Sequence, residues 1–184
     1  MKLPGAVLYL SMTIPLAAPA ALAADTASID ATMAKIYAAG AGAYEGVTHQ
    51  RSISQGGDWK TVTSKYTCTV TGPLAMTCQG TDVGEGDWVS KFRVENGIEY
   101  QDVTSTNGEP WSRQYVITDA WYTDEKNNGG TRTSTFTASN GVQLESMEDI
   151  AVMGNRFVIV SKMRRKGSDD PFAYSMIMDH VMMQ

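Results

Sequence analysis

The stretch KYTCTVTGPLAMTC, residues 65–78, decides the fold of this 184-residue chain. Its aromatic, apolar and cysteine residues alternate with threonines, and this period of two is typical of β-strands with one buried face. Gly72-Pro73 marks a turn between two such strands. A three-residue loop at this turn would place Cys68 opposite Cys78, with both side chains on the apolar face. The two sulfurs would then lie within reach of a disulfide bond.

A metal or redox site is the alternative interpretation of the cysteine pair. The sequence contains no C-x-x-C motif, and no histidine lies near either cysteine. We therefore favour a disulfide between Cys68 and Cys78. Such a bond would also be consistent with an oxidising compartment outside the cytoplasm.

The same alternation continues from Gly46 to the end of the chain, and turn residues interrupt it every 8–15 residues. Four of these turns are Asn-Gly, which is the strongest short hairpin signal. Nothing between the strand candidates resembles a crossover helix, so consecutive strands should be antiparallel. We expect an all-β fold, an antiparallel meander barrel of about 8–10 strands, with two stacked sheets as the other way to cover so many strands. The strand candidates are residues 46–54, 59–71, 74–82, 88–95, 98–105, 111–118, 131–139, 142–152, 156–163 and 171–181.

Two segments fall outside this pattern. Residues 119–130 could be a further half-strand or a corner. Apolar residues spaced at helical intervals predict one N-terminal helix over residues 28–40. Ser28 is the expected N-cap of this helix, and Gly40 is expected to end it. We expect the helix to cover a barrel mouth or a sheet face, with a lid or a partner-binding helix as the alternative.

The first 23 residues have the layout of a signal peptide. Lys2 is followed by an apolar stretch, and Ala21-Leu22-Ala23 forms an A-x-A cleavage site. The apolar run is too short to span a membrane. We therefore predict a signal peptide over residues 1–23, a single domain over residues 24–184, no integral membrane segment after processing, and a periplasmic or secreted protein.

Composition excludes some partners. The chain has 15 basic and 20 acidic residues, a net charge of −5. A nucleic-acid binder would need a basic face, so we expect no nucleic-acid partner. Docking by charge on an anionic membrane is disfavoured for the same reason. The chain is 42% hydrophobic, which is enough to form a core.

The layout resembles that of the lipocalin-type barrels. Gly57-Asp58-Trp59 matches the G-x-W motif of that family, although here it follows the first strand candidate instead of opening it. The resemblance implies that a basic residue late in the barrel packs over the tryptophan, and Arg164 and Arg165 are the candidates. The resemblance does not by itself determine the function.

Catalytic motifs are absent from the sequence. No G-x-S-x-G, H-E-x-x-H, EF-hand, P-loop or dinucleotide-binding pattern occurs. The acidic residues Glu145, Glu148 and Asp149 are expected on a solvated strand edge, because Glu148 points to the opposite side from the other two. We predict no catalytic residues and no cofactor.

Arg113 is the strongest candidate for a binding residue. Trp111, Arg113 and Tyr115 share one strand face, which places a cation among large apolar side chains. Inside a barrel this arginine could pair with the carboxylate of an apolar acid. Asp102 could satisfy the same guanidinium without any ligand. The predicted ligand-binding residues are Trp88, Tyr100, Trp111, Arg113 and Tyr115.

The C-terminal strand candidate carries methionines and a histidine on one face. Thioethers and an imidazole suit Cu(I), but methionine is also ordinary core filler. We favour packing and predict no metal site. The residues concerned are Met176, Met178, His180 and Met182.

We expect an exported, non-catalytic protein that holds a small apolar or amphipathic ligand in a barrel. The alternative is a structural or interaction protein with a filled barrel, and an enzyme of unknown class comes third. The size of the interior separates the first two, because a closed barrel would be filled by its own aromatic side chains. The side chains expected to fill it are Trp88, Phe92, Tyr115, Phe136, Phe157 and Tyr174.

Overall fold

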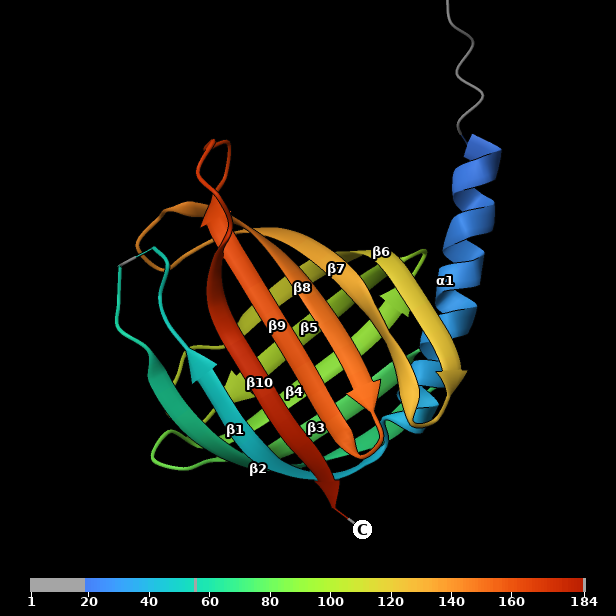
Figure 1. Cartoon of the computed structure of the whole chain (residues 1–184), viewed down its shortest axis with the longest axis horizontal. Helices are drawn as coiled ribbons and strands as arrows, with labels where there is room; N and C mark the ends of the chain where they lie inside the picture. The colour runs from blue at the N-terminus through green and yellow to red at the C-terminus, as the bar shows by residue number, and fades with distance from the viewer. Residues whose placement is uncertain (1–18, 55, 184) are drawn as a thin grey trace, which may run out of the picture.

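The computed structural model describes residues 19–54 and 56–183 (Figure 1). Residues 1–18 of the predicted signal peptide lie outside the described residues. The elements follow in the order α1 (Pro19–Ala39), β1 (Gly42–Gln50), β2 (Lys60–Gly72), β3 (Ala75–Asp82), β4 (Gly86–Glu95), β5 (Ile98–Ser105), β6 (Trp111–Asp124), β7 (Asn127–Thr137), β8 (Gln143–Met153), β9 (Arg156–Arg165) and β10 (Ala173–Met183).

The ten strands form one closed antiparallel barrel. Each strand pairs with its neighbours in sequence, and β1 closes the ring by pairing with β10 over eight residue pairs. The predicted meander barrel is confirmed, and the alternative of two stacked sheets is not observed among the described residues. Residues 119–130 are neither a half-strand nor a corner, because β6 continues to Asp124 and β7 begins at Asn127.

The hairpin between β2 and β3 has the predicted cysteine register. Cys68 lies opposite Cys78, and the two sulfurs form a disulfide bond. A β-bulge after Val70 pairs Gly72 with Ala75, so the turn is tighter than the expected three-residue loop. The bulge absorbs one residue beyond the cysteines and leaves their register unchanged.

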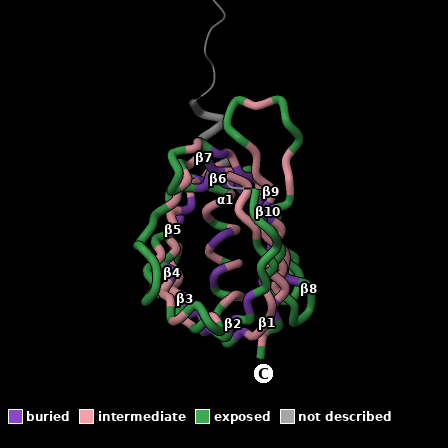
Figure 2. The backbone as a smooth tube through the Cα atoms, turned by 90° about the vertical axis from the view of Figure 1, so that its left-hand side faces the viewer, coloured by how far each residue is buried: buried purple, intermediate pink, exposed green. Residues whose placement is uncertain are grey.

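Helix α1 covers one end of the barrel, as expected. Its residues Met33 and Tyr37 form a buried apolar cluster with Val94 and Ile117 of the barrel. The helix lies within the outline of the ring of strands in Figure 2. The burial of this apolar face explains why α1 packs on its own barrel.

Helix α1 begins earlier than predicted. It starts at Pro19, so Ser28 lies inside the helix and is not its N-cap. Asp30, which also lies inside the helix, accepts hydrogen bonds from the backbone amides of Asn96 and Gly97, at 3.0 and 2.8 Å. These amides belong to the Asn-Gly turn between β4 and β5, where both residues have positive φ. The carboxylate of Asp30 therefore binds the helix to this hairpin.

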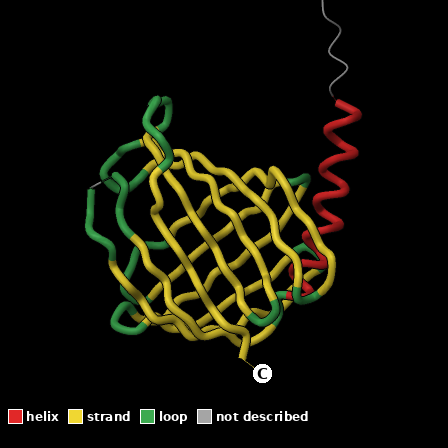
Figure 3. The backbone as a smooth tube through the Cα atoms, in the orientation of Figure 1, coloured by secondary structure: helices red, strands yellow, loops and turns green. Residues whose placement is uncertain are grey.

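The two ends of the barrel differ. Since the strands alternate in direction, the loops after β1, β3, β5, β7 and β9 gather at the end away from α1, which we call the open end (Figure 3). The other turns lie at the α1 end. Among the described residues, no helix has the length and apolar character needed to cross a membrane.

Short side chains occupy many inward positions of the barrel. Among the described residues, six serines are buried, although serine is mostly an exposed residue in proteins. Short inward side chains do not reach the centre of a ten-stranded barrel, so space remains there. The buried serines are Ser64, Ser90, Ser134, Ser146, Ser161 and Ser175.

Candidate ligand-binding cavity

The barrel encloses a cavity of about 710 Å³. Side chains of α1 and of all ten strands line it, from Tyr37 at the α1 end to Trp111 at the open end. This volume lies within the range of small-molecule binding sites in proteins. The closed, filled barrel that we considered as an alternative is therefore not what the structure contains.

One side of the cavity is aromatic. The rings of Tyr44 and Tyr66 stack with their centroids 5.1 Å apart, and Trp88 lies 5.4 Å from Tyr66. Phe157 lies 5.9 Å from Tyr44. We call these four side chains, together with the Cys68–Cys78 disulfide beside them, the aromatic wall. It offers a broad apolar surface to a ligand.

His180 joins this wall through two hydrogen bonds. Its Nδ1 lies 2.9 Å from the Tyr66 hydroxyl, and its Nε2 lies 3.2 Å from the hydroxyl of Thr48. The side chain is almost completely buried, with 1% of the residue exposed. Burial lowers the pKa of His180, and the nearby Asp82 and Asp179 offset only part of this effect. The imidazole is therefore neutral at pH 7, with one ring nitrogen donating and the other accepting.

Gly46 makes room for this histidine. It lies opposite His180 on β1, and a Cβ atom there would come within 2.4 Å of the imidazole Cδ2 and 2.3 Å of the Asp179 carbonyl oxygen. Only glycine allows the two strands to approach with the imidazole between them.

The methionines considered for copper lie close to the histidine. Met176 and Met178 line the cavity with His180, and Met182 packs against the aromatic wall. Hydroxyl groups occupy both imidazole nitrogens, so the arrangement agrees with packing. Across the described part of the chain, no group of three or more His, Cys, Asp or Glu side chains is arranged to hold a metal ion. The absence of a metal site stays a prediction.

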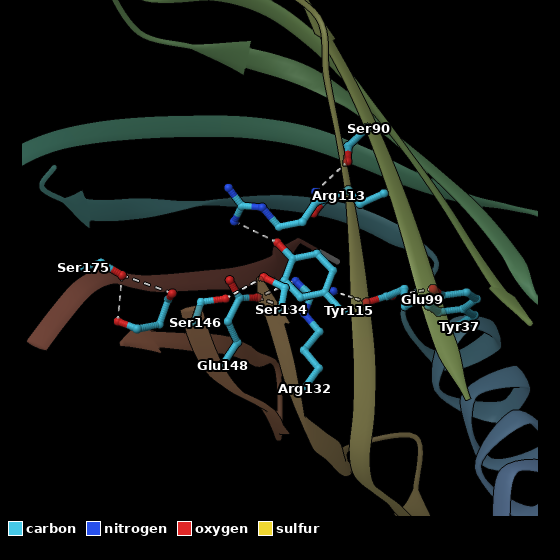
Figure 4. A network of polar contacts seen from close by, with 12 residues as sticks. Tyr37, Ser90, Glu99, Arg113, Tyr115, Arg132, Ser134, Ser146, Glu148 and Ser175 are labelled. Atoms are coloured by element: carbon cyan, nitrogen blue, oxygen red, sulfur yellow. Dashed lines mark hydrogen bonds and ion pairs between the residues drawn. The ribbon is translucent and has the colours of Figure 1, made fainter. Parts of the chain in front are cut away.

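The side opposite the aromatic wall contains a buried charge cluster, which we define as Arg132, Glu99, Glu148 and Tyr37 (Figure 4). Arg132 forms ion pairs with Glu99 and with Glu148, and its Nε donates to Glu148 Oε2 at 2.9 Å. The Tyr37 hydroxyl donates to Glu99 at 2.5 Å. The cluster thus joins α1 to β5, β7 and β8.

Burial and charge act together on the groups of this cluster. Burial by itself would lower the pKa of Arg132, but Glu99 and Glu148 outweigh it and raise the pKa well above the ordinary value. Burial and the neighbouring Glu99 raise the pKa of Tyr37 far above 10. Arg132 therefore stays charged, and Tyr37 stays a neutral hydrogen-bond donor.

The expected position of Glu148 on a solvated strand edge is wrong. Only 2% of Glu148 is exposed, because Arg132 neutralises it inside the barrel. Glu145 and Asp149 do point away from Glu148, as the alternation predicts, and they approach Arg164 and Lys162 on β9. The sequence contained the correct alternation but no indication of which face was internal.

Arg113 lies in the cavity without a carboxylate partner. Its guanidinium carbon lies 3.6 Å from the centre of the Phe136 ring, and its Nη1 donates to the Tyr115 hydroxyl at 3.2 Å. No carboxylate of the described residues forms an ion pair with it. Asp102, the competitor predicted from the sequence, faces outward and accepts a hydrogen bond from Ser112 at 2.5 Å. Most of the guanidinium N–H groups therefore remain available to a molecule in the cavity.

Four of the five predicted ligand-binding residues line the cavity, namely Trp88, Trp111, Arg113 and Tyr115. Trp111 is 42% exposed and marks the open end. The predicted inward position of Tyr100 is wrong. Tyr100 lies on the outer face of β5 beneath Arg93, whose guanidinium carbon is 3.8 Å from the centre of its ring. Its neighbours Glu99 and Gln101 take the inward positions.

The aromatic residues expected inside the barrel are divided in a similar way. Phe92 and Phe157 line the cavity, and Phe136 lies beneath Arg113. Tyr174 is 49% exposed on the outside. A β-bulge between Tyr174 and Met176 shifts the alternation, so that Ser175 points inward. A bulge of this kind changes which side chains face the core, and period-two reasoning misses it.

Several cavity residues were not predicted as site residues. Tyr44 and Tyr66 share the period-two alternation of their strands, and this signal could have identified them. Arg132 lies in a strand rich in threonine, serine and glycine, where no apolar face indicates the inside. Arg132 shares a strand face with Ser134 and Phe136, so its inward position follows only once Phe136 is known to be internal.

The family-specific contact implied by the lipocalin resemblance is not observed for Arg164. Arg51 lies over the ring of Trp59, at 4.9 Å, whereas Arg164 lies over Phe172 at 4.5 Å. Trp59 precedes β2 and is exposed. The barrel is established, while membership of the lipocalin-type family stays a prediction.

Comparison with known proteins identifies the fold. No protein-family model matches the chain, and no curated protein sequence matches it. Among solved structures, the crystal structure of Rv2717c from M. tuberculosis is similar, with a TM-score of 0.57 and 12% sequence identity, and the match covers 83% of this chain and 98% of that one. At this identity the similarity shows that the two chains share a barrel fold.

Proposed function

We propose that this protein binds a small apolar molecule with an acidic head group inside its barrel and is not an enzyme. The observation that carries the proposal is the guanidinium of Arg113, a cation that lines a cavity and has no carboxylate partner among the described residues. A cation in such a place is stabilised by an anion, and a ligand carboxylate can accept two of its N–H groups at once.

The rest of the cavity suits the remainder of such a ligand. The aromatic wall provides apolar contact area, and the buried serines leave the space that a ligand would fill. The charge cluster does not compete for the head group, because Arg132 is already paired with two carboxylates. Arg113 is therefore the preferred anchor for an anion.

Export to the periplasm or beyond the cell is part of the proposal. The sequence pattern of residues 1–23 supports it, and the disulfide is compatible with it. Intact-mass measurement of protein recovered from a bacterial periplasm tests the site of processing, which we expect before Ala24. A mature protein that retains residues 1–23 would contradict this part of the proposal.

The binding proposal is tested with delipidated protein and palmitic acid, by displacement of an environment-sensitive apolar dye. Trp88 and Trp111 line the cavity, so tryptophan fluorescence provides a second readout. We expect saturable binding of palmitic acid, and an Arg113→Met variant should bind it at least about tenfold more weakly. The same substitution should reduce the affinity for palmityl alcohol much less, because this alcohol has the same chain without the charge.

Arg93→Met is the matched control. Arg93 also lies over an aromatic ring, but on the outer face of the barrel. Its replacement should leave palmitic acid binding unchanged. Absence of saturable binding in the wild-type protein, or equal losses in the two variants, would reject the proposal.

A further inference from the structure

Gln101 is a cavity side chain that uses only part of its hydrogen-bonding capacity. It points inward from β5, lines the cavity and lies directly opposite Arg113 of β6 in the strand register. Its Nε2 donates to the hydroxyl of Ser90 on β4, at 3.0 Å. Its side-chain oxygen Oε1 has no hydrogen-bond partner among the described residues. One end of the amide is therefore fixed, and the other end is free.

A molecule in the cavity can reach the free end of this amide. Gln101 is half-buried, whereas Ser90 behind it is buried. Within the described part of the chain, Oδ1 of Asn128 is the one side-chain polar atom that is both unpaired and fully buried. Oε1 of Gln101 is also unpaired but is not such an atom, so it retains accessible surface. Because the side chain points inward, this surface faces the cavity.

A ligand hydroxyl group suits the free end of Gln101 in either orientation of the amide. The hydroxyl of Ser90 can donate or accept, so it holds the side chain in place whichever end of the amide faces it. A ligand hydroxyl has the same property, because it can donate to an amide oxygen or accept from an amide NH₂ group. A ligand carbonyl or ether oxygen can only accept. The hydroxyl is therefore the group that fits both cases.

Gln101 lies between Arg113 and the aromatic side of the cavity. On the side away from Arg113, it pairs with Phe92 of β4, which packs against the aromatic wall. Neighbouring strands are about 4.8 Å apart, so Arg113, Gln101 and Phe92 follow one another across the barrel over about 10 Å. A ligand whose carboxylate binds Arg113 therefore passes Gln101 before its chain reaches the aromatic wall.

We propose that Gln101 binds a hydroxyl group next to the carboxylate, and that the ligand is a long-chain 3-hydroxy acid. This inference rests on the proposed function and narrows the ligand class. Arg113 binds the carboxylate, Gln101 binds the hydroxyl, and the apolar chain contacts Phe92 and the aromatic wall. The separation of the two strands favours carbon 3, because a hydroxyl on carbon 2 lies directly beside the carboxylate at Arg113.

The test compares palmitic acid, 3-hydroxypalmitic acid and 8-hydroxypalmitic acid, using dye displacement on delipidated wild-type protein. 3-Hydroxypalmitic acid should bind at least as tightly as palmitic acid, because Gln101 replaces water as the partner of its hydroxyl. The hydroxyl of 8-hydroxypalmitic acid would lie among apolar side chains, which should weaken binding by about tenfold. Equal affinities for the two hydroxy acids, or weaker binding of 3-hydroxypalmitic acid than of palmitic acid, would overturn the proposal.

The variant Gln101→Met removes both polar atoms of the side chain and keeps its length. It should weaken the binding of 3-hydroxypalmitic acid by about tenfold relative to that of palmitic acid. The ratio of two ligands in one variant cancels any general loss of affinity. An unchanged ratio would contradict the role of Gln101. If the variant does not fold, the three affinities of the wild-type protein decide the matter.

Gln114→Met is the matched control. Gln114 follows Arg113 on β6 and is exposed on the outer face of the barrel. Its replacement should leave the ratio of the two affinities at the wild-type value. A similar change of the ratio in both variants would show that the effect does not arise inside the cavity, and would reject the proposal.

The outcomes separate this inference from the proposed function. If none of the acids binds saturably, the proposed function fails and the role of Gln101 fails with it. If palmitic acid binds through Arg113 but the 3-hydroxyl group weakens binding, only the hydroxyl subsite at Gln101 is rejected.

Discussion

The aromatic wall and the buried charge cluster stand on opposite sides of one cavity, since β2 and β7 lie five strands apart in either direction round the barrel. The aromatic wall is held by ring packing and by a disulfide, with contacts between strands that are neighbours or next-but-one in the barrel. The charge cluster is held by one arginine between two carboxylates from β5 and β8.

This difference implies different responses to damage. Loss of one aromatic contact removes only a small part of the stabilisation that the wall provides, because dispersion and apolar burial are distributed over many atoms. Loss of Arg132 leaves two carboxylates buried without a counter-charge. Substitutions within the charge cluster should therefore have strongly coupled effects on stability. Substitutions in the aromatic wall should have smaller effects that add independently.

The largest effect is expected for Arg132→Met. It should lower the free energy of unfolding by about 3–5 kcal/mol, because Glu99 and Glu148 would remain buried and unpaired. Urea unfolding followed by tryptophan fluorescence measures the loss. On the aromatic wall, Tyr66→Phe removes only the hydrogen bond to His180 and should cost about 1 kcal/mol.

A triple variant sharpens the comparison. Combining Arg132→Met with Glu99→Gln and Glu148→Gln removes the buried charges together and should recover most of the lost stability. If Arg132→Met costs no more than Tyr66→Phe, or if Glu99→Gln and Glu148→Gln destabilise the Arg132→Met protein further, the cluster does not act as a unit.

An intermediate effect is expected for the disulfide. Replacing Cys68 and Cys78 together by alanine should lower the free energy of unfolding by about 2–3 kcal/mol, because the closed loop is short. Reduction of the wild-type protein with dithiothreitol should lower the urea midpoint by about as much as the double alanine substitution does. An unchanged midpoint after complete reduction would show that the aromatic wall does not depend on this bond.

The smallest effect concerns pH and His180. Burial lowers the pKa of this residue in the folded protein, so the unfolded chain binds a proton more readily. Stability should be greatest above about pH 6.5, should fall as the pH decreases below that value by at most about 1.4 kcal/mol per pH unit, and should level off below the folded-state pKa. Urea midpoints between pH 7.5 and 5 measure this dependence.

His180→Gln isolates the contribution of the imidazole. Glutamine does not titrate in this range, so the variant should show a flatter stability profile between pH 7.5 and 5 than the wild-type protein. Identical profiles would mean that His180 is not the group that titrates, and that the aromatic wall contains no pH-sensitive contact.

The sequence was informative wherever a local pattern controlled the structure. The alternation around Gly72-Pro73 predicted the register of Cys68 and Cys78. Three of the four predicted Asn-Gly turns, at residues 96–97, 107–108 and 140–141, lie between sequential antiparallel strands. The fourth is wrong, because Asn128-Gly129 lies within β7 and pairs with β8. The shared face of Trp111, Arg113 and Tyr115 was also predicted, because residues two apart in a strand point to one side.

The misplaced barrel residues have two physical origins, an undetermined inward face and a β-bulge. Period two determines which residues share a face, but it does not determine which face is inside. On β5 the inward face carries Glu99, which no hydrophobicity rule would select, and Tyr100 is outside as a consequence. On β10 a bulge shifted the alternation and placed Tyr174 outside.

The sequence by itself determined most of the strands, their sequential order and the disulfide, because these depend on residues close together in the chain. Only the tertiary structure decided the closure of β1 on β10, the cavity and the burial of Arg132 between Glu99 and Glu148. Those features depend on pairings between residues far apart in the chain. An internal charge is stable only when such a distant partner reaches it, and no local pattern records that condition.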